Sequence, residues 1–190
     1  MILTAISGGI GSGKSVVACV LRAMGYDVYD CDVRAREIMD NDDRLRQRIA
    51  CEVCSDAVEC GRINRRRLAE KVFADEAALE KLNRIVHGAV KDDISRWAAT
   101  RLKPHAFIET AILYQSGIDR MADDVWEVTA PSQLRLQRAV GRGMDESDAR
   151  SRMAAQDSYE AVSAHPDVKM IVNDGIEAVI PQILSLLSAG

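Results

Sequence analysis

Short apolar runs alternate with helical periodicity in the first thirty residues. Residues 2–6 form an apolar run that ends in glycines, which is typical of a buried strand. Apolar side chains then recur at helical spacing over residues 14–24, and Gly25 follows as a helix-ending signal. Residues 28–29 predict a second short strand. This order of strand, helix and strand predicts a βαβ unit and therefore a parallel sheet.

The middle of the chain, residues 33–100, has a helical and polar pattern. Its clearest feature is one long amphipathic helix whose apolar side chains recur at steps of three and four, at Leu79, Leu82, Val86, Ala89 or Val90, Ile94 and Trp97. No internal repeat or linker-like stretch separates this part from the rest. We therefore predict a helical insertion within an α/β domain.

The alternation of strands and helices returns after residue 100. The predicted strands are at residues 106–108, 125–128 and 168–172. The predicted helices run from 131 to about 140, from 145 onward, and over 176–187. Pro181 lies inside the last of these and is expected to kink it. The pattern predicts a doubly wound α/β core with a parallel sheet of about five strands.

Composition restricts the class of protein further. The chain has 190 residues, of which 47% are hydrophobic and 28% are charged, as in ordinary globular domains. A net charge of −4 argues against broad nucleic-acid binding. No stretch approaches the about 20 apolar residues that cross a bilayer, and the start does not resemble a signal peptide, so we expect a cytoplasmic protein without membrane contact. The five cysteines predict neither a disulfide framework nor a zinc site.

The sequence Gly-Gly-Ile-Gly-Ser-Gly-Lys-Ser at residues 8–15 fits the pattern G-x-x-x-x-G-K-[ST]. Glycines let backbone N–H groups point at phosphate oxygens, and a following helix directs its positive end at the same anion. Lys14 would reach the β- and γ-phosphates, and the Ser15 hydroxyl would bind Mg²⁺ directly. The residues predicted to bind ATP are Gly9, Ile10, Gly11, Ser12, Gly13, Lys14, Ser15 and Val16.

A phosphate-binding loop of this kind fixes the nucleotide but not the reaction. The guanine-recognition sequence Asn-Lys-x-Asp is absent, and the chain is short for a motor or transporter ATPase. A small kinase fits these observations, and its acceptor could be a nucleoside or a nucleotide. A non-catalytic nucleotide-binding module is the alternative from a different class of protein.

Two acids follow the second predicted strand. Asp30 and Asp32 could accept a proton from the acceptor hydroxyl or hold Mg²⁺ through water, although acids in this position also serve as helix N-caps. Arg135, Arg138 and Arg142 follow at intervals that place them on one helix face. We interpret Arg135 as a solvated residue. Arg138 and Arg142, next to a glycine-flanked break, are candidates for a mobile lid.

Two further features of the insertion leave alternatives open. The basic cluster at residues 62–67, which contains Arg62, Arg65, Arg66 and Arg67, could bind acceptor phosphates or begin a polar helix. His87 lies close to the apolar face of the long helix. A core or capping role is as compatible with its position as a functional one.

The chain resembles dephospho-coenzyme A kinases along nearly its whole length. Residues 6–15 resemble the opening L-T-G-G-I-G-S-G-K-S of that family, and residues 28–36 resemble its V-x-D-A-D-x-x-A-R segment. Further similar segments occur in family order, at residues 63–73, His87, 133–142, 152–156 and 173–175. The D-x-D-x-x-x-R continuation discriminates better than the opening, which P-loop kinases share.

This resemblance implies ATP-dependent phosphorylation of the ribose 3′-hydroxyl of dephospho-CoA, which gives CoA and ADP. It implies a P-loop NTPase-like fold with a core of residues 1–32, 101–132 and 160–190, a helical acceptor domain of 33–100 and a lid of 133–159. Asp32 would be the base, Lys14 and Arg142 would act on the phosphates, and Mg²⁺ would be the metal. The acceptor contacts would be Asp32, Arg36, Arg65 and His87. We expect a monomer or a weak homo-oligomer.

Two departures from the family pattern stand out. The family's His-Pro pair is His87-Gly88 here, and its P-L-L-x-E segment is Ala-Ile-Leu-Tyr-Gln at residues 111–115. Gln115 thus replaces an acid with an amide. We assign no catalytic role to Gln115.

Overall fold

The computed structural model describes residues 1–160 and 165–189. Contacts divide the chain into two compact units, one of residues 1–29 and 101–190 and the other of residues 30–100. We call them the sheet unit and the helical unit. The predicted core segment 160–190 includes residues 161–164 and 190, which lie outside the described residues. Asp30 and Asp32 fall in the helical unit.

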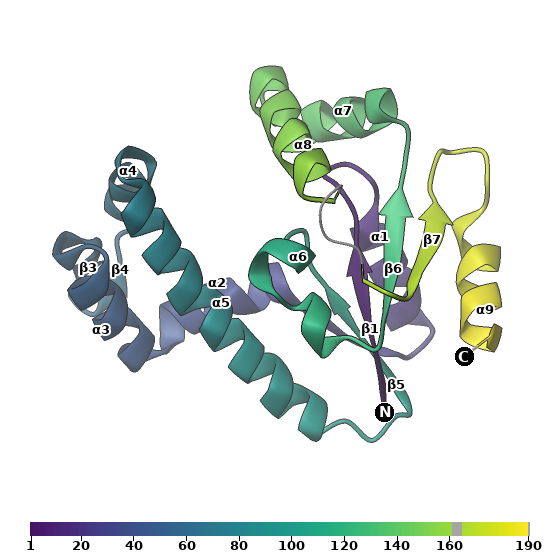
Figure 1. The fold of residues 1–190 in the computed structure, drawn as a ribbon, viewed down its shortest axis with the longest axis horizontal. Helices are drawn as coiled ribbons and strands as arrows, with labels where there is room; N and C mark the ends of the chain where they lie inside the picture. Colours follow the sequence, from purple (N-terminus) through teal and green to yellow (C-terminus); the bar gives the residue numbers. More distant parts are fainter. Residues whose placement is uncertain (161–164, 190) are drawn as a thin grey trace. The chain divides into compact units, whose positions relative to one another are not determined.

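The sheet unit is built on five strands in the order β2-β5-β1-β6-β7 (Figure 1). They are β1 (Ile2–Ser7), β2 (Asp27–Asp30, of which Asp30 is counted in the helical unit), β5 (His105–Glu109), β6 (Asp124–Thr129) and β7 (Val168–Val172). Strand β1 pairs in parallel with β5 and β6, and β6 pairs in parallel with β7. The predicted strands are therefore confirmed, and no strand end differs from its prediction by more than one residue.

The strand register brings several carboxyl ends to one edge of the sheet. Ile6 pairs with Glu109, Ser7 with Glu127, and Thr129 with Val172. Ligands of doubly wound α/β proteins bind at this edge, because the loops that follow the strands meet there. The candidate chemistry of the sheet unit is therefore to be sought after residues 7, 109, 129 and 172.

The core of the sheet unit lies between the sheet and its helices. Helix α1 (Lys14–Ala23) contributes Val17 and Leu21, both fully buried, to a cluster with Phe107 and Trp126 of the sheet. The ring centroids of Phe107 and Trp126 are 5.1 Å apart. These two large aromatic side chains fill the space between the sheet and α1.

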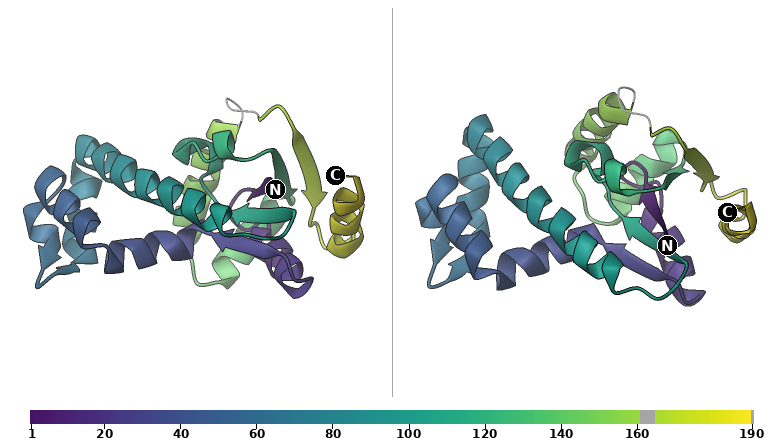
Figure 2. Two further views of the ribbon diagram at one scale, coloured as in Figure 1. Left: turned by 90° about the horizontal axis from the view of Figure 1, so that it is seen from below. Right: turned by 60° about the horizontal axis from the view of Figure 1, so that its bottom comes forward.

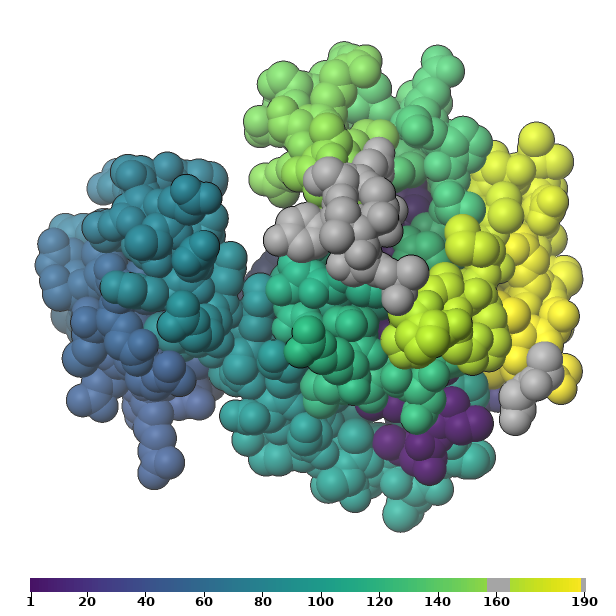
Figure 3. Space-filling view, in the orientation of Figure 1, coloured from purple at the N-terminus to yellow at the C-terminus, as the bar shows by residue number. Residues whose placement is uncertain are grey.

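The remaining helices of this unit follow the later strands. They are α6 (Leu113–Ser116), α7 (Ser132–Gly141), α8 (Glu146–Glu160) and α9 (Val179–Ala189), with a 3₁₀ turn at Asp119–Met121. Helix α9 packs beside β7 (Figure 3). The predicted start near residue 176 and the kink at Pro181 are wrong. The helix begins at Val179, so Pro181 lies in its first turn, where no intrahelical partner for an N–H exists.

The helical unit consists of four helices and a small hairpin (Figure 2). The elements are α2 (Cys31–Asn41), α3 (Asp43–Glu52), a 3₁₀ turn (Ser55–Ala57), β3 (Val58–Glu59), β4 (Arg62–Ile63), α4 (Arg65–Ala74) and α5 (Glu76–Ala99). Helix α5 confirms the predicted long amphipathic helix. Ile49 and Ile85 are buried in the core of this unit. The antiparallel hairpin β3–β4 was not predicted.

No helix among the described residues is long and apolar enough to cross a bilayer. All five cysteines are free in this structure. Cys51 and Cys60 are exposed.

Candidate nucleotide-binding site

The loop of residues 8–13 joins β1 to α1 at the carboxyl edge of the sheet. Gly11 and Gly13 have φ angles of 75° and 103°, in the left-handed region that favours glycine. A Cβ on Gly11 would meet the backbone of Arg135, and one on Gly13 would meet the Asn173 side chain. Both glycines are therefore required by the backbone conformation and by close approach of neighbouring chain segments.

The carbonyl groups of this loop are held from outside by side chains of α7 and of the segment after β7. Arg135 Nε donates a hydrogen bond to the Ile10 carbonyl at 3.1 Å, and Asn173 Nδ2 donates one to the Ser12 carbonyl at 2.8 Å. The Asn173 backbone is itself fixed, because its N–H donates to the carbonyl of Thr129 at 2.8 Å. These contacts fix the orientation of two peptide planes in the loop.

The same contacts orient the loop's N–H groups. In a trans peptide the C=O and the following N–H point in opposite directions, so the bonded carbonyls of Ile10 and Ser12 turn the N–H groups of Gly11 and Gly13 to the other side of the loop. Over residues 1–160 and 165–189, neither N–H donates to a protein acceptor. The first turn of α1 adds the positive end of a helix. The loop is therefore a cradle for an anion.

Lys14 places a positive charge on this loop. Its Nζ donates to the carbonyl of Gly8 and, at 3.2 Å, to that of Gly9. Ser15 follows in the first turn of α1, and its side chain is exposed. An ammonium held on the loop and an accessible hydroxyl beside it are the groups that phosphate oxygens and Mg²⁺ need.

Arg135 and Arg138 of α7 contact the loop. Arg135 is only 8% exposed, so its interpretation as a solvated residue is wrong. Arg138 Nη1 donates to the carbonyls of Gly11 at 3.3 Å and Asn173 at 3.0 Å. Arg142 ends the helix as an exposed C-cap residue, and its catalytic role stays a prediction.

Gln156 and Glu109 are two site residues to which the sequence assigned no role. Gln156 Oε1 accepts a hydrogen bond from the Ile10 N–H at 2.7 Å, and its Nε2 donates to the Ala111 carbonyl at 3.4 Å. Gln156 lies in a segment of family resemblance, which was the available signal. Glu109 is the last residue of β5, and its Oε2 lies 3.6 Å from Nη2 of Arg22. Its position at a strand end could have singled it out.

Asp30, Asp32 and Arg36 belong to α2 and its cap in the helical unit. Asp30 is the N-cap, and its Oδ1 accepts a hydrogen bond from the Val33 N–H at 3.0 Å. Asp32 is exposed in the first turn. Arg36 is also exposed and has no ion-pair or hydrogen-bond partner within the described residues.

The basic cluster at residues 62–67 is largely neutralised by acids of its own unit. Arg65 pairs with Asp40 at 2.8 Å. Arg66 pairs with Glu70 at 3.6 Å, and Arg67 pairs with Glu59 at 2.5 Å. Arg62 has no such partner in the part of the chain that the structure describes. The pairing of Arg65 has to open if that residue is to bind an acceptor phosphate.

His87 is half-buried on α5. Burial and, to a smaller extent, the charge of Lys91 lower the pKa of His87 below its ordinary value. The imidazole is therefore neutral at pH 7 and suited to a hydrogen bond rather than an ion pair. The neighbouring Gly88 leaves open space where a side chain would stand.

The residues available to bind a metal suit Mg²⁺ better than a metal ion that takes all its ligands from protein side chains. Within the described residues, no group of three or more His, Cys, Asp or Glu side chains is arranged to hold an ion. Mg²⁺ at phosphate sites takes one or two protein ligands, with waters and phosphate oxygens filling the rest. The accessible Ser15 hydroxyl meets that requirement.

The strand, glycine loop and helix at the carboxyl edge, with a lysine on the loop, define a P-loop nucleotide-binding protein of the P-loop NTPase-like α/β fold. Comparison with known families narrows this class. The family model described as dephospho-CoA kinase matches residues 2–178. The chain belongs to the dephospho-CoA kinase family.

Curated relatives agree with this family assignment, and solved structures agree with the fold. A dephospho-CoA kinase of Porphyromonas gingivalis is 35% identical over 98% of this chain and 93% of its own length, and one of Bacteroides fragilis is 33% identical over 96% and 90%. A crystal structure of TT1252 from Thermus thermophilus has a TM-score of 0.82 at 29% identity, covering 99% of this chain and 96% of its own. Dephospho-CoA kinase from Campylobacter jejuni, at 20% identity and a TM-score of 0.67 over 98% and 94%, shares the fold.

Proposed function

We propose that this protein transfers the γ-phosphoryl group of ATP to the ribose 3′-hydroxyl of dephospho-CoA, the last step of CoA biosynthesis. The observation that supports the nucleotide half of the reaction is the loop geometry: the Ile10 and Ser12 carbonyls accept hydrogen bonds from Arg135 and Asn173, and the Gly11 and Gly13 N–H groups donate to no acceptor within the described residues. Family membership supplies the acceptor.

The proposed reaction is an in-line transfer of the phosphoryl group, in which each residue has a defined role. Asp32 accepts the proton of the 3′-hydroxyl, the hydroxyl oxygen forms a bond to the γ-phosphorus, and the bond from that phosphorus to the bridging oxygen of ADP breaks. Lys14 and the loop N–H groups stabilise charge on the phosphoryl oxygens. Arg142 is proposed to add a further positive charge there.

The acceptor contacts are proposed for the helical unit. Arg36 is exposed and has no partner within the described residues, so of the proposed arginines it can bind an acceptor phosphate without first losing an ion pair. Arg65 is already paired with Asp40, so it would bind the acceptor by exchanging that partner. His87 is neutral, so it would contribute a hydrogen bond. We keep residues 33–100 as the acceptor domain and 133–159 as a lid.

We propose Mg²⁺ as the metal, with Ser15 as the direct ligand and Asp30 in contact through water. When bound, the ion would neutralise charge that develops on the phosphate oxygens. Asp30→Asn tests the second contact, because asparagine keeps the N-cap. An increase in the Mg²⁺ concentration needed for half-maximal activity supports the contact, and an unchanged requirement contradicts it.

Acceptor competition tests the proposed reaction as a whole. The purified protein is given ATP and Mg²⁺ with dephospho-CoA, nucleosides and nucleoside monophosphates, and ADP release is measured. We expect turnover with dephospho-CoA and a new 3′-phosphomonoester in the product, seen by phosphorus NMR. Turnover restricted to nucleosides would overturn the acceptor, and ATP binding without consumption would indicate a binding module.

The cellular setting is proposed to be the cytoplasm. The five free cysteines support a reducing compartment. We propose a monomer or a weak homo-oligomer, which sedimentation at several concentrations will test.

A further inference from the structure

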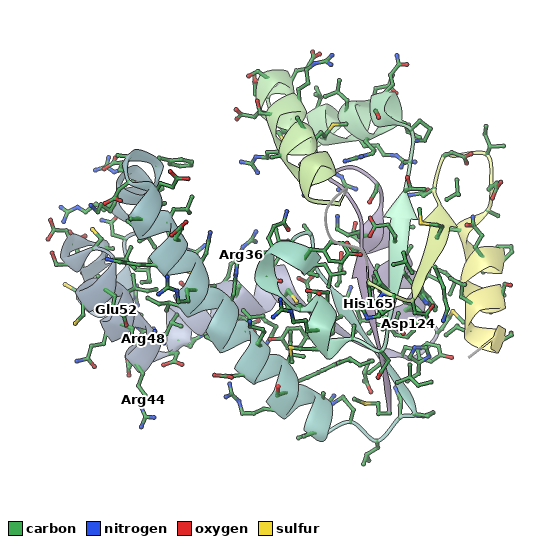
Figure 4. The ribbon with its side chains drawn as sticks, viewed as in Figure 1. Arg36, Arg44, Arg48, Glu52, Asp124 and His165 are labelled. Carbon is green, nitrogen blue, oxygen red and sulfur yellow. The ribbon has the colours of Figure 1, made fainter. Side chains whose placement is uncertain are left out.

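Helix α2 presents two different faces in the helical unit. Asp32 and Arg36 are four residues apart and share one face, and both are exposed. Arg34 lies two residues from each of them, which places it about 200° around the helix, on the opposite face. In Figure 4 the Arg36 side chain extends from α2 away from the side on which Arg44 of α3 lies.

Arg34 is bound to a buried carboxylate of α5. Arg34 Nε and Nη2 both donate to Asp93 Oδ2, at 3.0 and 2.8 Å, and Asp93 is only 9% exposed. Arg34 Nη1 donates to Glu37 at 2.7 Å, and the second oxygen of Asp93 accepts a longer bond of 3.3 Å from Arg96. The guanidinium therefore has directed partners on three of its nitrogens.

Apolar packing of the first half of α2 depends on a single buried side chain. Cys31 is the one buried residue of this helix. Ile38 and Met39 pack at the edge of the unit's core, but they lie in the second half. Apolar contacts are non-directional, so they tolerate rotation of a helix about its axis, whereas two hydrogen bonds to one fixed carboxylate do not.

We propose that the Arg34–Asp93 pair positions α2 so that Asp32 and Arg36 are held in the orientation that acceptor binding and phosphorylation require. Arg34 and Asp93 are positioning residues, which act on Asp32 and Arg36 through α2. This inference rests on the proposed function, because Asp32 and Arg36 matter only if the helical unit handles the acceptor.

Arg34→Gln and Asp93→Asn test the pair. A small misplacement of a reacting group costs on the order of tenfold to a hundredfold, so we expect kcat/KM for dephospho-CoA to fall at least about tenfold, with a higher KM for that substrate. The KM for ATP should stay within about twofold, because the nucleotide loop belongs to the other unit. Arg34 is partly exposed, so its variant decides the matter should Asp93→Asn fail to fold.

Arg48→Gln is the matched control. It removes an arginine–glutamate pair from the same unit, since Arg48 bonds Glu52 at 2.9 Å on α3 with both side chains about half exposed. Its kinetic constants should equal those of the unaltered protein. Unchanged acceptor constants in Arg34→Gln would overturn the proposal. So would a loss explained entirely by a smaller folded fraction, with both KM values unchanged.

Amide hydrogen exchange separates failure of this inference from failure of the proposed function. Exchange over residues 31–41 should be faster in Arg34→Gln than in Arg48→Gln. If the unaltered protein does not phosphorylate dephospho-CoA, the proposed function fails, and the exchange measurement alone decides whether the pair anchors α2. Equal exchange in the two variants overturns the anchoring.

Discussion

Asp32 carries the proposed proton transfer, and it is exposed in the first turn of α2. Asp32→Asn keeps the size of the side chain but cannot accept a proton from the 3′-hydroxyl. We expect kcat to fall at least about 10²-fold with the ATP dissociation constant nearly unchanged. Asp43→Asn, which alters an acid in the first turn of α3, is the control. Full activity in Asp32→Asn would remove Asp32 from the chemistry.

Lys14 should differ from Asp32 in affecting both nucleotide binding and transfer. Its ammonium lies on the carbonyls of Gly8 and Gly9, so Lys14→Ala removes the charge closest to the loop. We expect ATP affinity to fall about tenfold and kcat to fall at least about 10²-fold. Calorimetric titration with a non-hydrolysable ATP analogue measures the first quantity, and single-turnover kinetics measure the second.

Lys103→Ala is the matched control for Lys14. Lys103 is also a lysine of the sheet unit that donates to a backbone carbonyl, that of Gly25, but it lies outside the loop. It should bind the analogue as the unaltered protein does. Equal analogue affinity in Lys14→Ala and Lys103→Ala would contradict the phosphate-binding role of Lys14.

At the scale of elements, the segment after β7 supports the nucleotide loop through Asn173. Its Nδ2 bonds the Ser12 carbonyl at 2.8 Å, which fixes the peptide plane that presents the Gly13 N–H. Asn173→Ala should therefore weaken ATP binding about tenfold, as expected for losing one hydrogen bond that preorganises an anion site. Equilibrium binding of an ATP analogue gives the ratio.

Gln182→Ala controls for general damage at this end of the sheet. The Gln182 side chain bonds both the N–H and the carbonyl of Val172, at 2.8 and 2.9 Å, and makes no contact with the loop. The Gln182→Ala variant should have a lower melting temperature and an unchanged ATP affinity. If both variants weaken ATP binding equally, the effect of Asn173→Ala is indirect.

Periodicity and turn residues predicted most of the elements but not how they meet. The predicted helix after Pro131 corresponds to α7, yet the loop carbonyls that its arginines bond are 125 to 127 positions away in the sequence, as the Ile10 carbonyl is from Arg135. A helical pattern indicates that Arg135 and Arg138 share a face. It does not reveal that this face meets the glycine loop.

The hairpin β3–β4 was missed because each strand has two residues, too few for an alternating pattern. The available signal was the turn. Cys60 and Gly61 have φ angles of 49° and 74°, as a two-residue hairpin of the I′ kind requires. Cysteine is an unusual residue at such a position, so the pair did not stand out.

At the scale of the whole molecule, a buried polar network at the amino ends of the strands makes stability depend on pH. Asp124, labelled in Figure 4, accepts hydrogen bonds from Lys169 at 2.7 Å and from Trp126 at 3.3 Å. It also accepts one from Thr4, whose hydroxyl lies 2.7 Å from His105 Nε2. The network joins β1, β5, β6 and β7.

The two titrating groups of this network act in the same direction. Burial acts to raise the pKa of Asp124, but the hydrogen bonds and charge of Lys169, with the other donors, outweigh it and hold that pKa below its usual range. Burial lowers the pKa of His105, with Lys169 adding to it against the charges of Asp124 and Asp123. In both cases the unfolded chain takes up the proton first as the pH falls.

The free energy of unfolding should therefore decrease below about pH 6.5, where an unfolded histidine is protonated, and again below about pH 4, where an unfolded aspartate is. Asp124→Asn should cost about 2 kcal/mol at pH 7, the scale of a hydrogen bond to a charged group. The difference between the two proteins should narrow below pH 4, because only the unaltered protein still has Asp124 to protonate.

Urea unfolding followed by Trp126 fluorescence in a Trp97→Phe background reports on the sheet unit, since Trp97 is the tryptophan of the helical unit. Asp167→Asn is the control, because Asp167 contacts Lys169 only at 3.8 Å and is largely exposed. The Asp167→Asn substitution should lower the free energy of unfolding by no more than about 0.5 kcal/mol at any pH. If the difference between the unaltered protein and Asp124→Asn persists undiminished at pH 3, the loss reflects packing or an uncharged hydrogen bond. The acid sensitivity must then come from other carboxylates with a lowered pKa, such as Asp145 and Asp174, which cap turns at the surface.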